Sequence, residues 1–88
     1  MRALSLAVVL ACGCGPASYF SVTAEASRTL AEATAKGGQE AAPYELTAGL
    51  LYLARARELA GYARWQDALV CGRRAGSLGH AALRRATR

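Results

Sequence analysis

Apolar residues recur along this chain at the spacing of an α-helix, in three successive stretches. In the first stretch one helical face carries residues three or four positions apart, namely Tyr19, Val22, Ala26, Leu30 and Ala33. Ser18 is suited to be the N-cap of this helix, and Gly37-Gly38 is suited to end it after Lys36. The pattern therefore predicts a helix over 19–36.

A second helix is predicted to begin at Pro43, because a proline without an N–H fits the first helical turn. Its main apolar stripe consists of Leu46, Leu50, Leu53, Ala56 and Ala60. Further apolar side chains widen the stripe beyond one face, namely Tyr44, Leu51, Tyr52 and Leu59. We therefore expect this helix to pack on two sides, to form the centre of the domain and to end near Gly61.

A third helix is predicted over about 65–86, after a tight turn at 61–64. Its apolar face is made mostly of small residues, namely Ala68, Cys71, Gly72, Ala75, Leu78, Gly79 and Ala82. Such residues allow helices to approach closely but bury little apolar area, so we expect a thin core and modest stability. Trp65 is expected to be substantially buried against the second helix, near Leu59. The predicted fold is all-α, a small three-helix antiparallel bundle over residues 19–88.

The first residues form a separate apolar run. Residues 3–11 are apolar apart from Ser5 and follow the basic Met1-Arg2. The run is too short to span a membrane, which needs about 20 residues, and it fits the apolar region of a secretory signal. Helix-breaking residues follow it at 12–16, which disfavours the alternative of a buried N-terminal helix. We therefore predict an N-terminal signal helix over 1–11.

The sequence Val9-Leu10-Ala11-Cys12 resembles the lipobox of bacterial lipoproteins. Cys12 is the predicted lipid acceptor, and Cys14 is the alternative, although the residues before it match less well. Residues 12–18 then form a lipidated tether. The residue after Cys12 is glycine rather than aspartate, and in such lipoproteins this implies transport to the periplasm-facing side of the outer membrane.

Two resemblances extend into the mature chain. The stretch 41–46, with its Ala-Pro-Tyr-Glu-Leu helix start, and the later Gly61, Trp65, Ala68 and Ala75 are similar to a domain-of-unknown-function family of small Gram-negative envelope lipoproteins. That resemblance implies a helical hairpin and an envelope location, although the arginine-rich third helix departs from the family. The segment from Gly61 to Ala75 also resembles a tetratricopeptide-like helix pair, but its period does not recur.

Positive charge is concentrated at the C-terminal end. Residues 64–88 carry a net charge of +5, whereas residues 15–63 carry −1. If the small residues of the third helix face the core, its arginines must spread over the outer surface, namely Arg73, Arg74, Arg84, Arg85 and Arg88. This pattern is compatible with a solvated surface, an anionic lipid or envelope polyanion, or an acidic protein partner.

No catalytic, metal or cofactor motif is recognisable. His80 is the lone histidine and Cys71 lies nine residues from it without further ligands. The spacing of Ser77, His80 and Asp67 does not indicate a catalytic triad. Cys71 is expected to be a small buried side chain, and its pairing with Cys14 stays open.

The sequence thus predicts a non-enzymatic, lipid-anchored interaction or structural module of the cell envelope, with no small-molecule substrate. The membrane and an envelope protein or anionic surface are its expected partners. The alternative is a cytosolic basic helical protein that binds nucleic acid.

Overall fold

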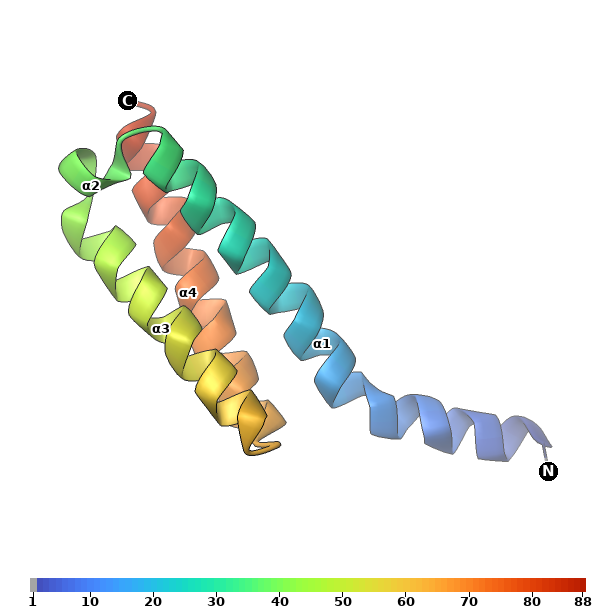
Figure 1. Ribbon diagram of the computed structural model, residues 1–88. Coiled ribbons are helices and arrows are strands. Elements are labelled where there is room, and N and C mark those ends of the chain that lie inside the picture. The colour runs from blue at the N-terminus through green and yellow to red at the C-terminus, as the bar shows by residue number, and fades with distance from the viewer. Residues whose placement is uncertain (1) are drawn as a thin grey trace.

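The computed structural model describes the backbone of residues 2–88 and the side chains of residues 15–88. These residues form only helices, which are α1 (Arg2–Ala35), α2 (Gly38–Ala41), α3 (Pro43–Gly61) and α4 (Trp65–Ala86). Figure 1 shows α3 running antiparallel to both α1 and α4, which point in the same direction. The predicted all-α class, with three long helices joined by short connections, is confirmed.

The beginning of α1 differs from the prediction. The helix does not start at Ser18 but runs on from Arg2 through residues 12–18, which the sequence predicted as a tether. Pro16 therefore lies inside α1 rather than before it. Pro16 has no N–H to bond with the preceding turn, which explains the bend of α1 where it leaves the bundle (Figure 1).

The connection between the first two long helices is compact. Gly37 adopts a left-handed conformation with φ of 87°, which ends α1 near the predicted position. Residues 38–41 form the short helix α2, which the sequence pattern did not predict. Pro43 then occupies the first turn of α3, as predicted.

The central helix is α4, not α3 as the sequence indicated. Helix α4 contacts both α1 and α3 along much of its length, whereas α1 and α3 contact each other far less. Of the apolar residues that widened the α3 stripe only Leu59 is buried, whereas Tyr44 is 73% exposed and Leu51 is 66% exposed, so they do not form a second buried face. The predicted two-sided packing therefore belongs to α4.

Small side chains explain why α4 occupies the centre. A Cβ atom added to Gly72 would lie 3.2 Å from both Val22 Cγ1 and Thr23 Cγ2 of α1. A Cβ atom added to Gly79 would lie 3.2 Å from Leu30 Cγ, so side chains of α1 lie directly against the backbone of α4. Gly72 and Gly79 are buried together with Ala75 and Ala82, as the predicted apolar face requires.

Two apolar clusters form the core. The larger joins the three long helices and contains Ala26, Leu30, Ala33, Ala42, Leu46, Leu53, Ala75 and Ala82. The smaller lies where α4 begins and contains Tyr19, Ala56, Leu59 and Ala68, with Trp65 and Cys71 partly buried against it. Leu30 and Leu46 are the largest fully buried side chains, so the core is as thin as alanine-rich helices dictate.

Candidate functional site

The predicted lipid acceptors lie in the first half of α1. Cys12 and Cys14 belong to the part of the chain whose side chains the structure does not describe. Their acylation therefore stays a prediction from the sequence, as does the division of residues 1–18 into a signal and a tether. Within the described residues, no helix has the combination of length and apolar character that crossing a membrane requires.

The predicted basic surface is the outer face of α4. All five arginines assigned to it are exposed, namely Arg73, Arg74, Arg84, Arg85 and Arg88. The small residues of α4 point the opposite way, into the bundle, so the helix separates its charge from its packing surface. We call these five arginines the basic face.

Two arginines of the basic face are held by α3. Arg85 Nη1 lies 2.7 Å from Glu45 Oε1, and the side chain of Glu45 is only 18% exposed. The other carboxylate oxygen of Glu45, Oε2, is buried without a hydrogen-bond partner among the described residues. The Cζ atom of Arg74 lies 5.7 Å from the ring centre of Tyr52, a cation–π contact. Arg74 and Arg85 therefore join α4 to α3.

The remaining three arginines are available to an external partner. No ion pair joins Arg73, Arg84 or Arg88 to any residue whose side chain is described. Of the carboxylates, Asp67 pairs with Arg64 and Glu58 pairs with Arg55, both at a spacing of three residues. The positive charge of Arg73, Arg84 and Arg88 is thus directed to solvent.

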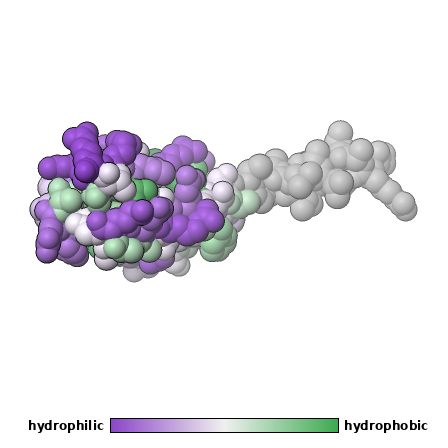
Figure 2. Space-filling view, turned by 90° about the horizontal axis from the view of Figure 1, so that it is seen from above, coloured by the Kyte–Doolittle hydropathy of each residue, from purple (hydrophilic) through white to green (hydrophobic). Residues whose placement is uncertain are grey.

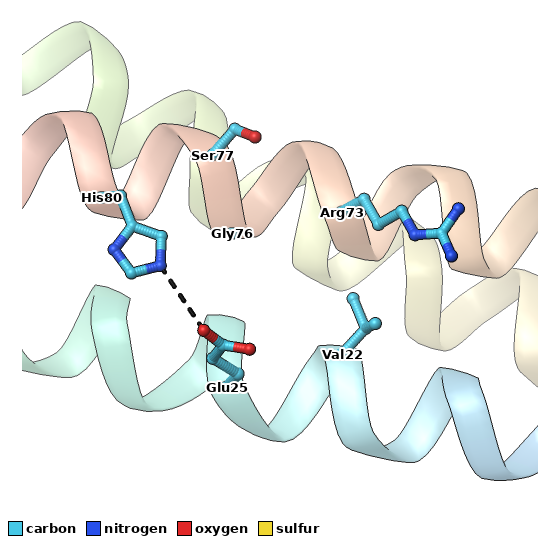
Figure 3. A pocket seen from close by; sticks show the side chains of 6 residues that line it. All are labelled: Val22, Glu25, Arg73, Gly76, Ser77 and His80. Atoms are coloured by element: carbon cyan, nitrogen blue, oxygen red, sulfur yellow. Dashed lines mark ion pairs between the residues drawn. The ribbon is translucent and has the colours of Figure 1, made fainter.

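A shallow groove of about 360 Å³ lies beside the basic face, between α1 and α4. Its lining consists of Val22, Glu25, Arg73, Gly76, Ser77 and His80 (Figure 3). His80 Nε2 lies 3.6 Å from Glu25 Oε1, and both side chains are at least half exposed. The ion pair is therefore well solvated and contributes little to binding or stability.

The side chains of Ser77, His80 and Asp67 do not come together as a catalytic triad. The Ser77 side chain points away from the His80 ring (Figure 3). Asp67 is paired with Arg64 in the first turn of α4, and thirteen residues of helix place it about 20 Å from His80. Among the described residues, no group of three or more histidine, cysteine, aspartate or glutamate side chains could hold a metal ion.

Two apolar surfaces were not anticipated. The outer side of α3 carries a shallow hollow of about 290 Å³, lined by Ala48, Leu51, Tyr52 and Arg55. At the other surface, Tyr19 and Phe20 of α1 meet Trp65 of α4, with ring centres 5.5 and 6.4 Å from the indole. The sequence placed Tyr19, Leu51 and Tyr52 on apolar helix faces. Only the arrangement of the helices shows that Leu51 and Tyr52 stay exposed.

Trp65 packs against the expected cluster around Leu59 and also contacts α1, which the sequence did not predict. It is half-buried rather than substantially buried, and it packs on the small cluster that includes Leu59. Its aromatic contacts are with α1, because α1 continues past the predicted start at Ser18 and covers one side of the indole.

Comparisons of the chain with protein-family models, with curated proteins and with solved structures found no match. The resemblances to envelope lipoproteins and to a tetratricopeptide-like helix pair therefore rest on the quoted motifs alone.

Proposed function

We propose that this chain is an exported bacterial lipoprotein, anchored through Cys12, whose helical domain is a non-enzymatic interaction module of the cell envelope. Cys14 is the alternative acceptor. The lipobox-like sequence 9–12 and the apolar run before it support the anchor. Glycine rather than aspartate after Cys12 supports the periplasm-facing side of the outer membrane as its location.

The observation that carries the interaction role is the unpaired part of the basic face. Arg73 and Arg84 project from α4, eleven residues and about 17 Å apart, and Arg88 lies two residues beyond the end of this helix. This spread gives no fork geometry for a single small anion. It suits an extended anionic surface, on which each basic residue contributes about 1 kcal/mol.

The proposal predicts salt-sensitive binding to an anionic surface. We expect the chain from residue 12 onward, with Cys12→Ser, to cosediment with phosphatidylglycerol-containing vesicles at low salt. It should be released at about 0.5 M salt, because the screening length then falls well below 8 Å. Replacing Arg73, Arg84 and Arg88 by Gln should remove most of this binding.

A matched control removes the same charge from other exposed positions, namely Arg28, Lys36 and Arg57. The control variant should retain its binding. Equal binding to phosphatidylcholine vesicles, or an equal loss in both variants, would contradict a role for the basic face. Tighter binding to duplex DNA than to the vesicles would instead favour the nucleic-acid alternative.

A further inference from the structure

One end of the bundle exposes aromatic side chains close to the predicted anchor. Phe20 of α1 is 62% exposed, and Tyr62, in the turn before α4, is 74% exposed. Tyr19, which is only 5% exposed, and the half-buried Trp65 lie beside Phe20, with ring centres 5.1 and 6.4 Å from it. We call Tyr19, Phe20, Tyr62 and Trp65 the aromatic end.

The length of chain between Cys12 and the bundle is short. A Cβ atom added to Gly15 would lie 3.5 Å from Trp65 Cβ, so α1 rests against α4 from Gly15 onward. Cys12 lies three residues earlier, which is about 4.5 Å as helix and at most about 11 Å if fully extended. An acyl group on Cys12 would therefore hold the aromatic end at the bilayer surface.

The chemistry of this end suits the interfacial region of a bilayer. Tryptophan and tyrosine combine an apolar ring with a polar group, and they are enriched at membrane–water interfaces. The carboxylates that flank the turn, Glu58 and Asp67, are each paired with an arginine, so neither opposes contact with lipid as a free charge. By contrast, hydrophilic side chains dominate the face of the molecule seen from above in Figure 2.

We infer that the aromatic end inserts into the interfacial region of the bilayer that holds the lipid anchor, an inference that rests on the proposed acylation of Cys12. The bundle then stands on the membrane with the end of α4 directed away from it. Arg84 and Arg88 lie roughly 30 Å along α4 from Trp65, several screening lengths from the anchoring bilayer. They are thereby presented to a second surface rather than to the membrane beneath.

Trp65 is the one tryptophan of the chain, so its fluorescence reports on this end specifically. The full-length sequence is expressed, and the acylated mature chain is purified from membranes. Its acylation is verified by intact mass, and it is placed in phosphatidylcholine vesicles. We expect lipids brominated near the headgroup to quench Trp65 more strongly than lipids brominated at the chain end. The double variant Phe20→Ser, Tyr62→Ser should lose most of the quenching.

The control variant Tyr44→Ser, Leu51→Ser alters two side chains of similar exposure on α3 and should retain the quenching. Circular dichroism checks that both variants stay helical. An acylated chain whose Trp65 is not quenched overturns the inference and leaves the anchor standing. Equal losses in the two variants also overturn it. An unacylated chain, recognised by its mass, overturns the proposed function and this inference with it.

Discussion

At the scale of single residues, glycines determine how closely α4 approaches α1. Gly72 lies against Val22 and Thr23 with almost no space for a side chain. Gly76, one turn later, has more room, because an added Cβ would lie 3.9 Å from Ala26 Cβ. Helix periodicity placed Gly72 on the apolar face of the third helix, but the sequence could not indicate how crowded this position is.

This difference predicts opposite effects on stability. We expect Gly76→Ala to stabilise the fold by about 0.5–1 kcal/mol, because alanine favours helix and its Cβ fits. Gly72→Leu should destabilise it by about 1–3 kcal/mol, because the added side chain must displace α1. Urea denaturation followed by circular dichroism measures both, and a stabilising Gly72→Leu would contradict the described packing.

Trp65 offers a second measurement at this scale. Because the indole is half-buried, we expect Trp65→Ala to cost about 2 kcal/mol, less than the 3–5 kcal/mol typical of a fully buried aromatic. Emission of the unmodified chain free of lipid should lie between the wavelengths of buried and of fully hydrated tryptophan. Emission equal to that of free tryptophan would show that the contact with Tyr19 does not persist in solution.

At the scale of helices, the sequence predicted the boundaries of α3 and α4 better than it predicted which helix lies at the centre of the bundle. Apolar spacing located the boundaries of α3 and α4 to within a residue or two of those observed. It assigned the central position to α3 because α3 has more large apolar residues. A central helix must instead approach two neighbours at once, and the small residues of α4 permit this.

The contacts of the basic face also depended on tertiary structure. The divergence of Arg73 and Arg74 followed from helical geometry, and their exposure is confirmed. Nothing in the sequence pattern connected Arg85 with Glu45, which lies forty positions away in the chain. The fold therefore divides the five arginines into two that contact α3 and three that pair with no carboxylate among the described side chains.

This division predicts that substitutions of the neighbouring Arg84 and Arg85 lower the free energy of unfolding by different amounts. Arg85→Gln should destabilise the fold by about 1 kcal/mol, because it leaves the mostly buried Glu45 carboxylate without its partner. Arg84→Gln should change stability by less than about 0.5 kcal/mol. A double-mutant cycle with Glu45→Gln isolates the Arg85–Glu45 coupling, and a coupling of zero would exclude a structural role for the pair.

At the scale of the whole molecule, the two ends of the bundle differ in chemistry. One end carries exposed aromatic residues near Cys12, and the other carries the C-terminal arginines. Both the charge asymmetry and the lipid anchor were predicted from the sequence. It did not anticipate their separation along the bundle, because the expected tether at 12–18 left the orientation of the domain undetermined.

The central claim is the lipid anchor, and mass spectrometry of the mature N-terminus tests it most directly. We predict that chain isolated from the bacterial envelope begins at Cys12 and carries acyl groups on that residue. Cys12→Ser should abolish both the cleavage and the added mass, whereas Cys14→Ser should leave them unchanged. An unmodified N-terminal peptide that still begins at Met1 would contradict the account.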